Sequence, residues 1–173
     1  MQDLGTLPGY NESYALGVSA DGTVVVGGAR NAAGQRRAFV WTASGGMQDL
    51  GTLPGGTWSE ARGVSADGSV VVGWADNAEG QGRAFVWTAL GGMQELDTLG
   101  GESRANGVSA DGAVVVGGAY NADGDWHAFR GMQDLGTLGG DYSEASGVSA
   151  DGRAVVGVAS TADSPYRAFL WKA

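Results

Sequence analysis

The pattern of apolar and polar positions predicts short strands that recur along the chain. Residues 24–26, 70–72 and 114–116 are each three consecutive valines, and residues 154–156 form a fourth apolar run. A short continuous apolar run between turn residues is typical of a strand that is buried on both faces. Gly, Asn and Asp separate these runs from their neighbours, which is the pattern of antiparallel strands joined by hairpins.

The same unit occurs four times. Its core, GVSADG, stands at residues 17–22, 63–68, 107–112 and 147–152. Residues 1–9 and 47–55 are identical. Self-similarity of this length is the signature of a repeat architecture, so we treat each repeat as one folding unit.

Each unit predicts four strands, which in the first unit are residues 13–20, 23–29, 37–42 and 47–53. Asp21 and Gly22 link the first two strands and predict a two-residue hairpin turn in which both residues have positive φ. The first strand is rich in Ser, Ala and Gly, which suits a crowded inner position. The third strand contains Phe and Trp side chains, which are large enough to fill the space between two sheets.

A four-stranded unit that is apolar on both faces predicts one blade of an all-β propeller. The four blades expected in this single domain are residues 13–53, 59–99, 103–138, and 143–173 plus 1–7. By the repeat pattern, residues 1–7 are a fourth strand that no third strand precedes, and residues 167–171 are a third strand that no fourth strand follows. We expect residues 1–7 to pair with residues 167–171 and close the ring, which would remove the loose sheet edges. The alternatives are an eight-bladed ring of two chains and a stacked β-solenoid.

The third unit departs from the others. His127-Ala128-Phe129 runs directly into Arg130-Gly131-Met132, without the VWTA segment of the first two units. We expect a much shorter hairpin between the third and fourth strands of this blade.

Composition narrows the possible partners. The 173 residues have a net charge of −9 and one lysine, Lys172, so neither nucleic acid nor an anionic membrane surface is expected as a partner. There is no cysteine for disulfide or thiol chemistry. No apolar run approaches the roughly 20 residues of a membrane helix, and no signal peptide is visible.

The repeated motifs resemble a known bacterial family. The segments MQDLGTLGG, GVSADGxVVVG and RAFVW, together with the literal His127-Ala128-Phe129, are similar to the HAF repeat. The resemblance covers essentially the whole chain. It implies a secreted or cell-surface location, because the HAF repeat is described as extracellular, and it brings no catalytic residues with it.

The most variable segments are the loops that follow the second strand of each unit and those that enter the first. Variable loops on a repetitive scaffold are where binding usually occurs. Their aromatic residues suit stacking on sugar rings, although they could equally pack between blades. These candidates for a glycan or another cell-surface ligand are Tyr10, Trp58, Tyr120, Trp126, Tyr142 and Tyr166.

Two polar positions are further candidates. Near these loops stand Glu12, Glu60, Glu102 and Glu144, which could supply a carboxylate pair for glycoside chemistry. Their other interpretation is solvated charge, and repetition argues against a single catalytic site. His127 stands where the three other units have Arg37, Arg83 and Arg167. This position could bind a carboxylate or sulfate, but its regular recurrence favours a structural ion pair or hydrogen bond.

We expect no metal site and no cofactor. One histidine cannot make a His-based metal site. Residues 121–125 are rich in oxygen ligands, but the matching Asn31 and Asn77 of other units favour an Asx-type turn over a calcium loop. A structural ion or water in the channel between the inner strands is the remaining possibility.

Together these features predict a non-catalytic extracellular binding or adhesion module with a carbohydrate-like ligand. The alternative is a purely structural segment of a larger secreted protein, and a polysaccharide-acting enzyme ranks third. We expect a monomer, with the two-chain ring as its alternative.

Overall fold

The computed structural model describes all residues from 1 to 173 and contains only β-strands. The first sheet contains β1 (Glu12–Val18), β2 (Val24–Arg30), β3 (Arg36–Thr42) and β4 (Gly46–Asp49). The second contains β5 (Ser59–Val64), β6 (Val70–Asp76), β7 (Gly82–Thr88) and β8 (Gly92–Glu95). The third contains β9 (Ser103–Val108), β10 (Val115–Tyr120), β11 (Trp126–Arg130) and β12 (Gln133–Asp134). The fourth contains β13 (Ser143–Val148), β14 (Ala154–Thr161) and β15 (Ser164–Lys172).

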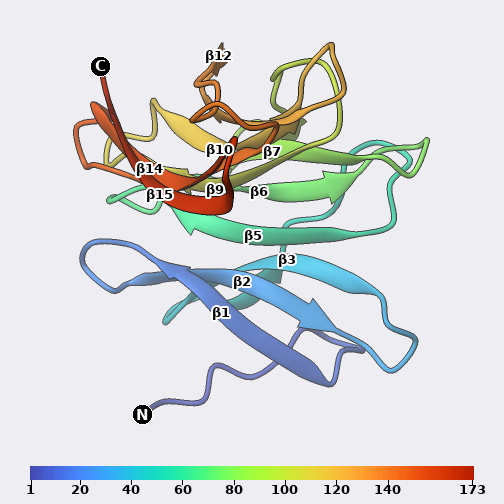
Figure 1. Cartoon of the computed structure of the whole chain (residues 1–173). Helices are drawn as coiled ribbons and strands as arrows, with labels where there is room; N and C mark the ends of the chain where they lie inside the picture. Colours follow the sequence, from blue (N-terminus) through green and yellow to red (C-terminus); the bar gives the residue numbers. More distant parts are fainter.

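Each sheet is one repeat, and its strands pair antiparallel in chain order. The sheets follow one another face to face from the N-terminal to the C-terminal end of the molecule (Figure 1). The first strands of successive sheets, β1, β5, β9 and β13, also contact one another. The predicted all-β class, the repeat unit and the inner position of the first strand are therefore confirmed.

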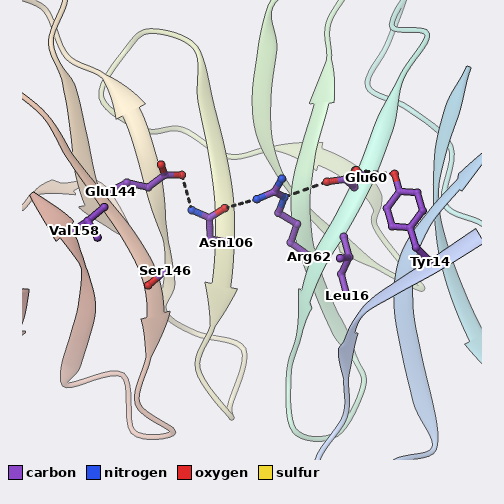
Figure 2. A pocket seen from close by; sticks show the side chains of 8 residues that line it. All are labelled: Tyr14, Leu16, Glu60, Arg62, Asn106, Glu144, Ser146 and Val158. Atoms are coloured by element: carbon purple, nitrogen blue, oxygen red, sulfur yellow. Dashed lines mark hydrogen bonds and ion pairs between the residues drawn. The ribbon is translucent and has the colours of Figure 1, made fainter. Parts of the chain in front are cut away.

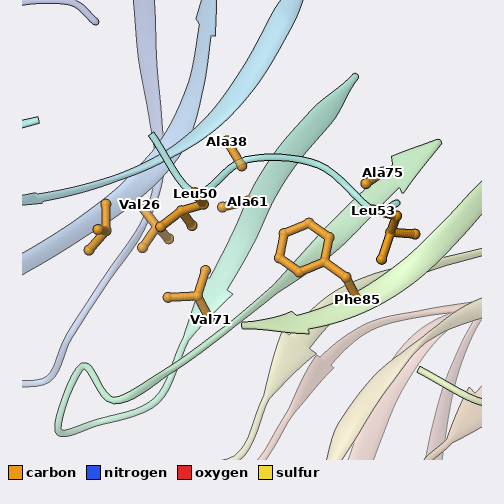
Figure 3. Close-up of a cluster of buried hydrophobic side chains, with 9 residues drawn as sticks. Val26, Ala38, Leu50, Leu53, Ala61, Val71, Ala75 and Phe85 are labelled. Atoms are coloured by element: carbon orange, nitrogen blue, oxygen red, sulfur yellow. The ribbon is translucent and has the colours of Figure 1, made fainter. Parts of the chain in front are cut away.

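The apolar runs are buried on both faces because each inner sheet packs between two neighbours. Val71 and Val72 are adjacent and fully buried, but Val71 packs into the seam with the first sheet and Val72 into the seam with the third. Figure 3 shows the first seam, where Val26 and Ala38 of the first sheet and Val71 and Phe85 of the second belong to one cluster with Leu50 and Leu53 of the connecting segment.

Two sets of hydrogen bonds repeat across every seam. In the first set, a backbone N–H of the third strand of one sheet donates to a serine on the first strand of the next. These pairs are Ala38 to Ser59 (2.9 Å), Ala84 to Ser103 (3.0 Å) and Ala128 to Ser143 (2.8 Å). In the second set, the N–H of the alanine in each SADG turn donates to the carbonyl of the next. These pairs are Ala20 to Ala66 (3.1 Å), Ala66 to Ala110 (3.0 Å) and Ala110 to Ala150 (3.0 Å).

The SADG turn differs from the predicted hairpin. The link between β1 and β2 runs over residues 19–23, and only Gly22 has positive φ, at 75°. The prediction of positive φ at Asp21 is wrong because the carboxylate organises a longer turn. Asp21 accepts hydrogen bonds from the Ser19 hydroxyl (2.7 Å) and from the Thr23 backbone N–H (3.0 Å).

Ring closure is not present in this structure. Residues 1–7 form no strand, and the fourth sheet has only β13, β14 and β15. The two termini lie at opposite ends of the stack (Figure 1). Residues 1–7 stay with the first sheet, since Leu7 is buried against Ala29 and Phe39 and the Ser13 hydroxyl donates to the Gly5 carbonyl (2.7 Å).

The third sheet has the short hairpin that its sequence predicts. Arg130 pairs with Gln133, so only Gly131 and Met132 separate β11 from β12. The fourth strands are shorter than predicted, because β4 ends at Asp49 and the chain then crosses to the next sheet.

We expect the glycine that ends each apolar run to be irreplaceable. A Cβ at Gly73 would lie 2.0 Å from the Glu60 carbonyl oxygen, at the point where the register shifts between Ala61 and Gly63. Gly73→Ala should therefore lower the free energy of unfolding by about 2 kcal/mol or more, measured by urea denaturation. Gly107→Ala is the control, since its Cβ would meet nothing closer than 3.5 Å. Equal losses in both variants would contradict this account.

The SADG turns should make stability depend on acidity. Hydrogen bonds from the Ser69 N–H and from the Ser65 and Ser69 hydroxyls lower the pKa of Asp67 to about 2. Similar bonds lower the pKa of Asp21, Asp111 and Asp151. A pKa lower in the folded than in the unfolded state stabilises the fold above the unfolded pKa of about 4, and this contribution is lost as pH falls toward 2.

Asp67→Asn keeps the acceptor oxygen but removes the titration. Its melting temperature should therefore fall less steeply between pH 4 and 2 than that of the unmodified chain, measured by circular dichroism. Asp123→Asn is the control, because the Asp123 carboxylate accepts no hydrogen bond, and it should keep the original slope. An unchanged slope in Asp67→Asn would rule out this source of acid sensitivity.

Candidate functional site

A cavity of about 480 Å³ opens between the inner strands of the four sheets. Figure 2 shows its polar side chains in a row across these strands. Its lining residues are Tyr14, Leu16, Glu60, Arg62, Asn106, Glu144, Ser146 and Val158.

All of the cavity residues except Val158 of β14 occupy the two variable positions of a constant strand motif, Ser-x-Ala-x-Gly. Alternation along a strand sends successive side chains to opposite faces. In β5, Ala61 therefore packs into the seam, and Glu60 and Arg62 lie on the opposite face and line the cavity. The constant residues build the seam, and the variable residues are free to build a site.

Glu60 is the most enclosed of these groups, with a side chain only 6% exposed. Its carboxylate accepts a hydrogen bond from the Tyr14 hydroxyl (2.7 Å) and pairs with Arg62 (3.1 Å) and Arg36 (3.3 Å). Tyr14 and Arg36 belong to the first sheet, so this cluster joins two repeats. Burial and donation to Glu60 raise the pKa of Tyr14 to about 12, which keeps it a neutral donor at physiological pH.

Glu144 forms a second cluster between the third and fourth sheets. It accepts hydrogen bonds from the Tyr142 hydroxyl (2.6 Å) and the Asn106 amide (2.9 Å), and the Arg104 Nε lies 3.3 Å from its Oε1. Burial, followed by donation to Glu144, raises the pKa of Tyr142. Arg62 donates to the Asn106 Oδ1 (3.2 Å), so the two clusters form one continuous network.

An aromatic groove of about 350 Å³ adjoins this network. It is lined by Trp74, Gly82, Glu102, Ser103, Arg104, Tyr120, Trp126 and Tyr142. The Tyr120 and Trp126 rings meet edge to face at 4.9 Å, and the Arg104 guanidinium lies 4.7 Å from the centre of a Trp126 ring. Arg104 and Tyr142 also hold Glu144, so the groove and the cavity share a wall.

The structure brings most of the predicted aromatic residues to this region. Tyr120, Trp126 and Tyr142 line the groove. Trp58 packs against Trp74 at 4.0 Å, and Tyr166 meets Tyr142 edge to face at 5.7 Å, so both lie beside it.

Tyr10 and His127 line neither hollow. Tyr10 packs against the cluster that contains Leu7 and Phe39, at the far end of the first sheet. His127 lies on β11 with its Nδ1 2.8 Å from Asp134.

The recurring Arg or His position has the structural role that its regularity favoured. Arg37 donates to the carbonyl of Thr57 and lies 3.9 Å from Asp49. Arg83 donates to the carbonyl of Gly101 and lies 3.4 Å from Glu95. The Asx-type turns are also present, since the Asn121 Oδ1 accepts from the backbone N–H groups of residues 123 and 125.

Sequence reasoning missed several residues of the site, including Tyr14, Arg62, Arg104 and Asn106. A signal for them existed, because they are variable positions inside the otherwise constant Ser-x-Ala-x-Gly frame. Trp74 was missed too, although it stands where two other repeats have Gly28 and Gly118.

Fixed donors occupy the two central carboxylates of the cavity. Both oxygens of Glu60 and both oxygens of Glu144 accept hydrogen bonds from neighbouring side chains. No three His, Cys, Asp or Glu side chains are grouped so that they could hold a metal ion. The structure contains no helix long and apolar enough to span a membrane.

Comparison with solved structures identifies the fold. TolB from Acinetobacter baumannii superposes with a TM-score of 0.69 at 14% identity, over 94% of this chain and 41% of that one. A protein assigned as TolB from Agrobacterium tumefaciens has a TM-score of 0.65 at 17% identity, over 90% of this chain and 59% of that one. The chain has a TolB-like β-propeller fold.

This likeness extends to the fold alone, and the chain spans about half the length of these two structures. No protein-family model and no curated protein matches the sequence. The resemblance to the HAF repeat therefore stays a prediction.

We expect Glu60 to hold the first two sheets together. Glu60→Ala would leave the Tyr14 hydroxyl and two arginines without their acceptor, and should lower the free energy of unfolding by about 2 kcal/mol. Urea denaturation measures this loss. The control is Glu12→Ala, an exposed carboxylate without an ion pair, which should stay within about 0.5 kcal/mol. A Glu60→Ala chain as stable as the control would mean that the network contributes nothing to the fold.

Proposed function

We propose that this chain is a non-catalytic binding module that takes a carbohydrate-like ligand in the aromatic groove. The observation behind the proposal is the combination of Tyr120, Trp126 and Tyr142 with Arg104 and Glu102 in one hollow. Sugar-binding requires flat apolar surfaces for ring faces and polar groups for hydroxyls, and aromatic residues beside charged ones supply both.

The size of the hollow supports this proposal. Ligand pockets are typically about 300–1,000 Å³, and the groove falls within this range. The cavity behind Glu144 adds further hydrogen-bonding groups, including Asn106 and Ser146, which a second sugar unit would reach. The proposed ligand is therefore a short oligosaccharide, with one ring on the aromatic residues and the next toward the inner strands.

The proposed module acts without catalysis, because glycoside hydrolysis needs a pair of carboxylates, and of the two at the groove Glu102 lines it whereas Glu144 is held by fixed donors. Its proposed location is extracellular or at the cell surface, where glycans are plentiful. The resemblance to the HAF repeat is the support for that location.

A structural scaffold is the second candidate, and a specific observation favours it. The side chains of the network satisfy one another across repeats, from Tyr14 through Glu60 and Arg62 to Asn106 and Glu144. A row of this kind stabilises the stack whether or not a ligand is present.

A glycan array followed by isothermal titration calorimetry tests the binding function. We expect one class of oligosaccharide to bind, and Trp126→Ala to weaken that binding about tenfold or more through the loss of its stacking surface. Trp41→Ala is the control, an aromatic residue of β3 that packs at the far end of the first sheet. It should keep the original affinity at temperatures where the chain is folded.

Three outcomes would contradict the proposal. Binding that is equally weak in both variants would place the ligand outside the groove. No binding to any glycan would favour the scaffold function. Turnover of a bound polysaccharide that is lost in Glu144→Gln would show that the non-catalytic assignment is wrong.

A further inference from the structure

The fourth sheet exposes a face that is buried in the other three. Val156 is 46% exposed, whereas the equivalent Val26, Val72 and Val116 are fully buried in seams. Leu170 on the neighbouring strand is 59% exposed. This face has the apolar residues of a seam but has no sheet packed against it.

The first sheet exposes the opposite half of a seam. Ala15 is exposed, whereas its equivalents Ala61, Ala105 and Ala145 are fully buried. Val18, at the end of the same strand, is 59% exposed. In the internal seams, the face equivalent to that of Val156 packs against the next repeat, and the face equivalent to that of Ala15 packs against the preceding repeat. The two ends of the stack therefore present complementary surfaces.

The hydrogen bonds of the seams are also incomplete in a complementary way. At the end of the stack, the Ala150 N–H makes no hydrogen bond and the Ala168 N–H has no serine partner. At its start, the Ala20 carbonyl accepts no hydrogen bond, and the Ser13 hydroxyl donates to Gly5 but accepts none. Each unmade bond at one end has its missing partner at the other.

Residues 1–7 already have the conformation of a segment that joins two sheets. The Gly5 N–H donates to Asp3 (2.9 Å), as the Gly51 N–H donates to Asp49 (2.8 Å). The φ angles of Gly5 and Gly51 are 76° and 78°. The segment that contains Asp49 and Gly51 begins with β4, which pairs with β3. Residues 1–3 match the residues of β4 in conformation, so they are shaped to pair with a third strand, which the first sheet does not supply.

The charged residues at the two ends of the stack are complementary as well. In the first three sheets, the Arg or His that leads the third strand lies beside an acidic residue of the fourth, as in Arg37 and Asp49. Arg167 of β15 occupies the same repeat position but has no acidic partner. Asp3 occupies the repeat position of Asp49 and forms no ion pair.

We propose that a second copy of this chain packs head to tail on the fourth sheet. Residues 1–3 of that copy add a fourth strand to β15, with Asp3 opposite Phe169 and Met1 opposite Trp171, as Asp49 and Met47 lie opposite Phe39 and Trp41. The Phe–acidic pairing of the fourth strand and the hydrogen bonds of the new seam each have three precedents within the chain, and the Met–Trp pairing has two, in the first and second sheets. Such a head-to-tail interface closes into a ring if the rotation per seam permits, and otherwise extends.

Light scattering on a sizing column and sedimentation velocity, over a range of protein concentrations, test the association. We expect a species heavier than one chain that grows with concentration. Leu170→Arg should weaken the association about tenfold or more, because it places a charge in the apolar seam. Because Leu170 is exposed in the single chain, this substitution should leave the fold of that chain intact.

A charge exchange tests the register. Asp3→Arg and Arg167→Asp should each weaken association severalfold, and the double variant should recover most of the loss, because it restores the pair with its charges reversed. Leu90→Arg is the control: Leu90 is fully exposed on the turn between β7 and β8, and its variant should associate like the unmodified chain.

Three outcomes would overturn the proposal. One is a single-chain mass at every concentration. Another is an association that Leu170→Arg and the charge variants leave unchanged. The third is a chain that stays monomeric but binds a synthetic peptide of residues 1–10 along β15, which would assign this edge to a neighbouring repeat in the same polypeptide.

Discussion

The structure depends on one constraint, which is that each sheet is apolar on both faces and must have a neighbour on each. Val71 and Val72 show it most directly, because adjacent residues of one strand fill two different seams. A single repeat cannot satisfy this constraint, since hydrophobic burial requires a second surface. The repeated serine and alanine hydrogen bonds then fix how one sheet sits on the next. Stability and architecture are thus properties of seams rather than of individual blades.

The same constraint separates structural positions from functional ones. In Ser-x-Ala-x-Gly the serine accepts the hydrogen bond across the seam, the alanine packs in the seam, and the glycine permits close approach of backbones, as at Gly17 beside the Arg62 carbonyl. The serine and the alanine tolerate little change, and the glycine tolerates a Cβ only where the neighbouring atoms are further away, as at Gly107. The two positions between these three residues face the cavity, and large polar residues such as Glu60 and Asn106 can occupy them. A site can therefore vary without disturbing the stack on which it is built.

Much of the fold was predictable from sequence because repetition and apolar runs are local signals. The first three strands of each repeat, the short hairpin at Gly131 and the buried valines of the inner sheets are as predicted, whereas the fourth strands are shorter and residues 1–7 form none. Ring closure was not predictable, because the sequence pattern specifies how two neighbouring sheets pack but not the rotation from sheet to sheet that accumulates along the chain. Glu60 was misread as solvated charge, since its partners Tyr14 and Arg36 come from another repeat. Tyr10 and Tyr142 lie in matching loops, although Glu12 holds the repeat position of Tyr142, and only Tyr142 has a preceding sheet against which to form a groove.

The open ends follow from the same physics as the seams. A seam within the chain forms between covalently linked repeats, so its partner is present at a high effective concentration. A seam between two chains lacks this advantage and must also overcome repulsion, because each chain has a net charge of −9. The contact of Asp3 with Arg167 would offset that repulsion only locally. Association through these ends is therefore weaker than any internal seam, and it strengthens where salt screens the acidic surfaces more than it screens the buried part of the new interface.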